Sequence, residues 1–136
     1  FCGYNFADYF AHWLSFDTAS AKLPRVFHVN WFRKGADGKF LWPGFGDNLR
    51  VLEWIIGRTQ GTAGGVDTPI GTLPRADDLD LDGVTLDDEA RDVLFGFDRA
   101  AWRAEFDGIA TSLDDYGPRM PQGLRDEQRR IAEALG

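Results

Sequence analysis

The chain has 136 residues, a mass of 15.2 kDa and a formal net charge of −7, with a sequence pI of about 4.7. That length is enough for one domain with a hydrophobic core, and the acidic balance argues against a general nucleic-acid binder. No run approaches the roughly 18 apolar residues that a membrane-spanning helix needs. The single cysteine, Cys2, together with two histidines excludes a disulfide framework and a thiolate zinc site within the chain. An intracellular location is therefore the default expectation.

Charge and aromatic residues are unevenly distributed. Residues 1–50 carry six basic and four acidic side chains, whereas residues 51–136 carry nine basic and eighteen acidic ones. All three lysines, both histidines and four of the five tryptophans lie within residues 1–54. A mildly basic, aromatic-rich segment suits an anionic ligand with a flat ring. The alternative is that the rings fill a core and the basic groups are solvated.

The first part of the chain predicts a helix followed by a hairpin. Apolar residues at helical spacing indicate a helix over 4–16, with Asn5 as its N-cap. Aromatic and β-branched residues predict strands at 26–32 and 39–42. The glycine-rich turn sequence at 35–38 would join these strands into a β-hairpin.

A second helix is expected to begin at Asp47 or Asn48, either of which can cap it, and to run to about Arg58. Its expected buried face consists of Val51, Leu52, Ile55 and Ile56. Residues 59–76 hold four glycines and two prolines, so we expect irregular structure there.

The remaining residues predict three further helices. The first begins near Thr85, with Asp88 three residues later as in a capped start, and runs to about residue 95. Asp98 caps a longer helix, and Pro121 opens the last one. Their expected apolar faces are Trp102, Phe106, Ile109, Ala110 and Leu113, and then Leu124, Gln128, Ile131 and Leu135. The sequence thus predicts an α+β fold that is mostly helical with a short β-hairpin.

Familiar nucleotide and nucleophile motifs are absent from the sequence. It contains no GxxxxGK(S/T) phosphate loop and no GxSxG elbow. Residues 44–49 begin like a dinucleotide fingerprint, but Leu49 stands where the third glycine belongs. The segment also follows a predicted hairpin strand and not a βαβ unit, so we reject that interpretation.

The acidic stretch matches the pattern of a calcium-binding loop. Asp78, Asp80, Asp82, Gly83 and Glu89 stand at the offsets that such a loop uses for its oxygen ligands and its tight turn. The prolines that precede them exclude an entering helix, and the alternation with leucine also fits a short edge strand. A calcium-binding module is therefore kept as an alternative function.

The strongest candidate site lies in residues 30–48, where five aromatic side chains fall on the predicted hairpin and on the loop that leaves it. A purine has two faces, and each can stack on an aromatic ring. Phe32, Phe40 and Phe45 have no polar tip, so they offer shape and stacking without discriminating between bases.

Discrimination between bases requires a donor–acceptor group, and Asn48 carries one at the start of the following helix. Guanine presents O6 as an acceptor where adenine presents a donor. Gly44 and Gly46 would allow the backbone to approach a ligand closely. The alternative is a core hairpin in which Trp31 and Trp42 are simply packed.

Seven stretches carry a resemblance to a known family: residues 27–34 (FHVNWFRK), 38–48 (GKFLWPGFGDN) and 50–54 (RVLEW), with shorter matches at 3–6, 11–15, 68–71 and 78–81. In this order they resemble the C-terminal part of GTP-dependent phosphoenolpyruvate carboxykinase. The resemblance covers essentially the whole chain and roughly the last quarter of a family member. It implies a fragment of a larger α/β nucleotide-binding domain. Residues 1–58 would form the helix, hairpin and guanine-pocket region, and residues 59–136 the acidic connection and C-terminal helices.

The resemblance also implies a function. The family converts oxaloacetate and GTP to phosphoenolpyruvate, GDP and carbon dioxide in gluconeogenesis, with Mn²⁺ or Mg²⁺. It implies a cytoplasmic enzyme whose partners are a guanine nucleotide and the remainder of the parent protein, with no nucleic acid and no membrane. The implied nucleotide-binding residues are Trp31, Phe32, Phe40, Phe45, Gly46, Asp47 and Asn48.

The sequence departs from the family in one place and lacks the family's catalytic parts. Asp47 stands where relatives often have Glu. The family's phosphate loop, metal ligands and catalytic lysine lie upstream of the matched part. We therefore expect this fragment alone to be inactive and to bind no metal. A purely structural packing segment is the second alternative.

Overall fold

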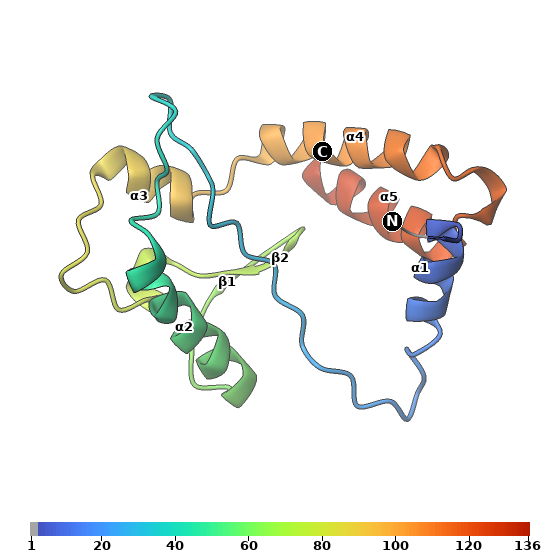
Figure 1. Cartoon of the computed structure of the whole chain (residues 1–136), viewed down its shortest axis with the longest axis horizontal. Helices are drawn as coiled ribbons and strands as arrows, with labels where there is room; N and C mark the ends of the chain where they lie inside the picture. Colours follow the sequence, from blue (N-terminus) through green and yellow to red (C-terminus); the bar gives the residue numbers. More distant parts are fainter. Residues whose placement is uncertain (1–2) are drawn as a thin grey trace. The chain divides into compact units, whose positions relative to one another are not determined.

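The computed structural model describes residues 3–136, so Cys2 lies outside the described residues. The chain divides into two compact units. We call them the terminal unit, residues 3–24 with Asp98–Gly136, and the central unit, Arg25–Phe97 (Figure 1).

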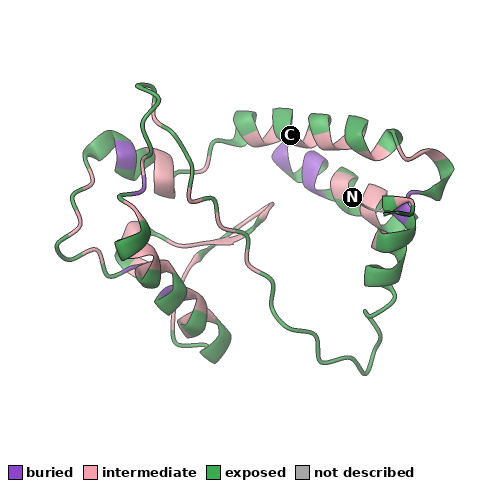
Figure 2. Cartoon of the chain, in the orientation of Figure 1, coloured by how far each residue is buried: buried purple, intermediate pink, exposed green. Residues whose placement is uncertain are grey.

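The terminal unit consists of helices α1 (Phe6–Leu14), α4 (Arg99–Asp114) and α5 (Gln122–Leu135), with the short 3₁₀-helix η3 (Gly117–Arg119) between the last two. Helices α4 and α5 lie side by side and run in opposite directions (Figure 1). The predicted stripes on both helices are at least partly buried, and Ile131 and Leu135 are buried, with 8% and 2% of their surface exposed. Figure 2 shows buried segments along α5. The apolar faces predicted for these two helices are therefore confirmed.

Both N-caps predicted in the terminal unit are confirmed. The side-chain Oδ1 of Asn5 accepts a hydrogen bond from the backbone N–H of Ala7 at 2.8 Å. The Oδ1 of Asp98 accepts one from Ala101 at 3.0 Å. Each bond satisfies one of the backbone donors that the first turn of a helix leaves without an intrahelical partner.

The central unit contains the 3₁₀-helix η1 (Phe45–Asp47), helix α2 (Asn48–Gln60), strands β1 (Val66–Thr68) and β2 (Gly71–Leu73), the 3₁₀-helix η2 (Ala76–Asp78) and helix α3 (Asp88–Phe95). Its core is a cluster of Trp42, Trp54 and Leu79. The side chains packed against this cluster are Phe27, Trp31, Val51, Ile55, Ala63, Leu81, Leu94 and Phe95. Two indole rings therefore form the centre of the unit that holds every predicted site residue.

The predicted location of the β-hairpin is wrong. Residues 26–32 form no strand, and the predicted pairing is reduced to a single antiparallel bridge between Lys34 and Phe40. The Asn30 side chain accepts the Phe32 N–H at 3.0 Å, a local turn contact that competes with strand pairing. The two-stranded hairpin lies instead at β1 and β2, with Val66 opposite Leu73, in the segment expected to be irregular.

The buried face predicted for α2 is partly wrong. Val51 and Ile55 are partly buried, but Leu52 and Ile56 are 44% and 52% exposed. The helix instead directs Trp54 into the core, where its indole Nε1 donates to the Gly64 carbonyl at 3.0 Å. Because Trp54 is the largest side chain on the helix, its burial sets which face turns inward.

The cap predicted for α3 is also wrong. The helix begins at Asp88, and Asp87 is its N-cap, with Oδ1 accepting the Ala90 N–H at 2.7 Å. Thr85 stands before that cap and outside the helix.

The predicted fold class is confirmed. The described residues contain five α-helices and one two-stranded antiparallel hairpin. The division of the chain near residue 58 stays a prediction. Across residues 3–136, none of the helices combines the length and the apolar character needed to cross a membrane.

Candidate functional site

The loop at residues 33–41 brings two of the predicted rings together. It turns at Gly35–Gly38, where the Gly38 N–H donates to the Gly35 carbonyl at 3.0 Å, and it projects from the central unit in Figure 1. The Asp37 carboxylate accepts the Lys39 N–H at 2.9 Å and lies 3.0 Å from the Lys39 ammonium. Both contacts with Lys39 lower the pKa of Asp37, and the backbone hydrogen bond is the larger cause. The Asp37 carboxylate in turn raises the pKa of Lys39. The loop is thus closed by its own side chains.

Phe32 and Phe40 form an edge-to-face pair beside this loop. Their ring centroids are 5.8 Å apart with an interplanar angle of 62°, and the Lys34 ammonium lies 5.4 Å from the centre of the Phe40 ring. Phe32 is 70% exposed and Phe40 57% exposed. The pair therefore presents apolar ring surface beside a positive charge, which suits a flat anionic ligand.

A hollow of about 590 Å³ lies beside the start of α2. Four of the seven predicted site residues line it, Trp31, Phe45, Gly46 and Asn48, together with Leu49 and Leu52. Phe45 is 92% exposed and is the most open large apolar side chain described. The structure thus brings an aromatic ring and a carboxamide to one hollow, while Phe32 and Phe40 form a separate ring pair.

Asn48 is held from the core side by a tryptophan. The indole Nε1 of Trp42 donates to the Asn48 Oδ1 at 2.9 Å. Trp42 is only 7% exposed, and its ring lies 6.4 Å from that of Trp31. The core cluster therefore fixes one end of the carboxamide that the sequence predicts as the base-reading group.

Asp47 does not line the hollow but anchors the loop that does. Its Oδ1 accepts from the Arg50 Nε at 3.0 Å. The same guanidinium donates to the carbonyls of Asp80 and Asp82, at 2.7 and 2.8 Å. Arg50 thus ties η1 to the segment after η2.

Sequence reasoning missed the roles of Trp42 and Arg50. The Asp47 and Arg50 pair is visible as opposite charges three residues apart at a helix start. The Trp42 contact has no such local signal, because the turn at η1 is what brings position 48 back to position 42.

A family model described as the phosphoenolpyruvate carboxykinase C-terminal P-loop domain matches residues 1–134. The chain belongs to this family. It is 48% identical over 136 residues to the GTP-dependent phosphoenolpyruvate carboxykinase of Chlamydia trachomatis serovar D, and 50% identical over 137 residues to that of Chlamydia pneumoniae. These alignments cover 99% of this chain but 23% of each relative, so the chain spans about a quarter of the length of the curated relatives it matches.

The metal implied by membership of the carboxykinase family finds no ligand set in the described residues. Among residues 3–136, no three His, Cys, Asp or Glu side chains cluster closely enough to hold a metal ion. The carboxylates of the calcium-loop alternative are likewise not gathered into such a cluster in the described residues. Asp78 pairs with Arg75 at 2.9 Å, and the Asp80 and Asp82 carbonyls are bound by Arg50.

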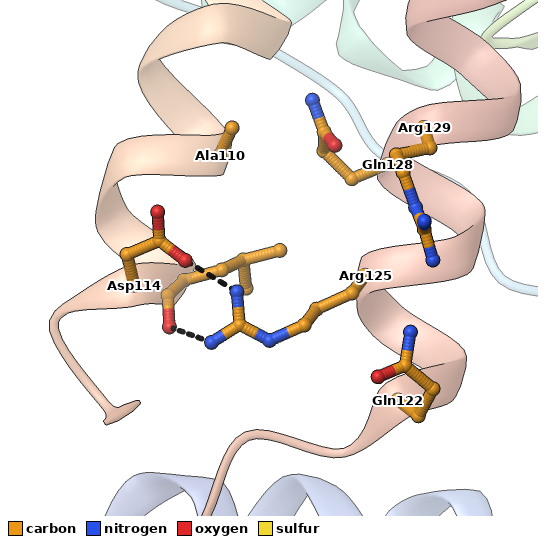
Figure 3. Close-up of a pocket in the computed structure, with 7 residues that line it drawn as sticks. Ala110, Asp114, Gln122, Arg125, Gln128 and Arg129 are labelled. Atoms are coloured by element: carbon orange, nitrogen blue, oxygen red, sulfur yellow. Dashed lines mark hydrogen bonds and ion pairs between the residues drawn. The ribbon is translucent and has the colours of Figure 1, made fainter. Parts of the chain in front are cut away.

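A second hollow, of about 410 Å³, lies between α4 and α5 of this family member. Figure 3 shows Arg125 reaching from α5 to the Asp114 carboxylate. The same guanidinium donates to the Leu113 carbonyl at 3.3 Å. Arg125 also donates to the Gly117 carbonyl at 3.2 Å. These contacts tie the start of α5 to the end of α4, so Arg125 has a structural role in the turn between the two helices.

Proposed function

We propose that the chain is the guanine-recognising C-terminal portion of a cytoplasmic GTP-dependent phosphoenolpyruvate carboxykinase. The parent enzyme would convert oxaloacetate and GTP to phosphoenolpyruvate, GDP and carbon dioxide, as in gluconeogenesis. The observation that carries the proposal is the hollow shared by Phe45 and Asn48 in a chain of this family.

In this proposal the chain supplies base binding and not phosphoryl transfer. The exposed ring of Phe45, with Trp31 lining the same hollow, would stack on the purine. The Asn48 carboxamide would read its edge, where guanine O6 accepts and the adenine amino group donates. Phe32 and Phe40 would add ring surface, and Gly46 and Asp47 would shape the loop between Phe45 and Asn48.

The divalent metal, Mn²⁺ or Mg²⁺, and the residues that hold the triphosphate would come from the rest of the parent enzyme. The described residues offer no cluster for the metal, and the sequence has no phosphate loop motif. We therefore expect the 136-residue chain alone to have no carboxykinase activity.

The test is a pair of substitutions in the full-length enzyme. Asn48→Ala should remove the preference for GTP over ATP, because the base edge loses its reader. Phe45→Ala should raise the dissociation constants of both nucleotides about equally, because stacking does not depend on base identity. Val26→Ala, at an exposed apolar side chain of the central unit that does not line the hollow, is the control. An unchanged GTP preference in the Asn48 variant would refute the proposed site.

A further inference from the structure

The amide of Asn48 has a defined orientation. An asparagine carboxamide carries an acceptor at one end and a donor at the other, and the two ends have nearly the same shape. The contact that decides between them is the 2.9 Å hydrogen bond from the Trp42 Nε1 to the Asn48 Oδ1. The indole N–H is only a donor, so it can face the amide oxygen but not the amide nitrogen.

The partner that sets this orientation is itself immobile. Trp42 is 7% exposed and belongs to the core cluster with Trp54 and Leu79. A side chain packed on all sides cannot turn to accommodate a rotated amide. Rotating the Asn48 amide would place its NH₂ group against the indole N–H, two donors facing each other, and would leave a buried donor without an acceptor.

We infer that Trp42 is the positioning residue that makes the Asn48 side chain selective for guanine, an inference that rests on the proposed function. With its oxygen held by Trp42, the amide has its nitrogen left to donate to a base in the hollow. The O6 of guanine accepts such a bond, whereas the 6-amino group of adenine presents a donor in the same place. The 6-amino group of adenine could be matched only by an amide that turns its oxygen toward the base, and the Trp42 hydrogen bond opposes that rotation.

The experiment compares two Trp→Phe substitutions in the full-length enzyme. Trp42→Phe removes the N–H that holds the amide. Trp54→Phe is a matched control, because Trp54 is also 7% exposed, lies in the same cluster and donates its Nε1 to a carbonyl, that of Gly64 at 3.0 Å. The measured quantities are the dissociation constants of GDP, IDP and ADP and the thermal midpoint.

The expected result is a change in preference that the control does not share. Trp42→Phe should lower the GDP-over-ADP preference about 3- to 10-fold, which corresponds to the net free-energy contribution of one hydrogen bond. IDP, which keeps O6 but lacks the 2-amino group, should weaken by the same factor as GDP. Trp54→Phe should lower the thermal midpoint without changing the preference.

Two further variants separate the possible failures. In an Asn48→Ala background, Trp42→Phe should change the preference no further, since it acts only through the amide. If Asn48→Ala abolishes the preference and Trp42→Phe leaves it intact, the positioning role is wrong and the proposed function stands. If Asn48→Ala leaves the preference intact, the proposed function itself fails. Should Trp42→Phe not fold, benzothienylalanine at position 42, which keeps the ring shape without the N–H, gives the same comparison.

Discussion

The carboxylate of Asp78 stabilises a short turn of the central unit through charge. It accepts the Arg75 backbone N–H at 2.8 Å and the Arg75 guanidinium at 2.9 Å. The backbone hydrogen bond is the largest cause that lowers the pKa of Asp78, followed by the contact with the guanidinium. Because the pKa is lower in the folded chain, the contact stabilises the fold above the unfolded pKa of about 3.9, and the stabilisation is lost as pH falls through the folded pKa.

We therefore expect Asp78→Asn to loosen η2 at neutral pH, and we expect this effect to fade as the pH falls through the lowered pKa of Asp78, where the carboxyl group of the wild type becomes protonated. Amide hydrogen exchange of residues 76–79 in the full-length protein measures this, as a ratio between variant and wild type at each pH. Asp77→Asn, at the exposed neighbouring position, is the control. A ratio that stays constant from pH 7 to acid would show that charge on Asp78 is not what holds the turn.

At the residue scale, the sequence predicted those contacts that reach no further than a few positions. The caps at Asn5 and Asp98 were predictable because each joins a side chain to a backbone N–H two or three residues away. The cap of α3 was not, since Thr85 and Asp87 both have the required chemistry and only the packing of the helix selects one. The bond between Trp42 and Asn48 depends on the intervening turn and has no local signature.

At the element scale, the loop that places Phe45 depends on one glycine. Gly44 has φ 139° and ψ −170°, a backbone conformation that is essentially restricted to glycine. No other atom lies within 4 Å of a Cβ built there, so the constraint is the backbone and not the space around it. A side chain at this position would be strained by about 1–3 kcal/mol, or the loop would change its path.

We expect Gly44→Ala to weaken binding of guanine and adenine nucleotides alike in the full-length enzyme, because the displaced element is η1, which carries Phe45. Isothermal titration with GDP and ADP measures the effect. Gly108→Ala, at an unstrained helical position of α4 with nothing within 4 Å, is the control and should leave both affinities unchanged. If Gly44→Ala binds both nucleotides as tightly as wild type, the turn at Gly44 does not position Phe45.

The helices and the strands were not equally predictable. Helix positions followed from caps and from apolar spacing, both of which are local. The composition of residues 26–32 is typical of a strand, but a strand also needs a partner, and in the described residues only Lys34 and Phe40 form a bridge nearby. The real strands, β1 and β2, are three residues each, which is too short for a periodic pattern to show.

For the site, the sequence identified the residue types and only part of their arrangement. Phe45 and Asn48 line the same hollow, as their three-residue spacing at a helix start allows. Phe32 and Phe40 form a pair because the turn at residues 35–38 folds them together. Which face of α2 turns inward was decided by Trp54, whose burial follows from a contact with Gly64 that no pattern in the helix itself reveals.

At the scale of the whole molecule, helix α1 and the turn that follows it present a row of aromatic side chains to solvent. Tyr9, Trp13 and Phe16 are exposed, and consecutive rings along this row lie 6.1 and 5.9 Å apart. A contiguous exposed apolar surface of this kind marks a face that another surface covers. If the chain is the C-terminal portion of a larger enzyme, as proposed, the remainder of that enzyme is the expected cover.

Substitutions in this row should affect the 136-residue chain and the full-length enzyme differently. Replacing Trp13 with Gln and Phe16 with Ser should reduce binding of an apolar dye by the 136-residue chain, because exposed apolar surface is removed. The same changes should destabilise the full-length enzyme by about 1.5–3 kcal/mol for each side chain that is covered there. Dye fluorescence and the denaturant midpoint measure the two effects, with Asp17→Asn, at an exposed neighbouring position, as the control. A full-length enzyme that keeps its midpoint would mean that this face of α1 stays open to solvent, since removing apolar atoms from an uncovered surface costs no burial.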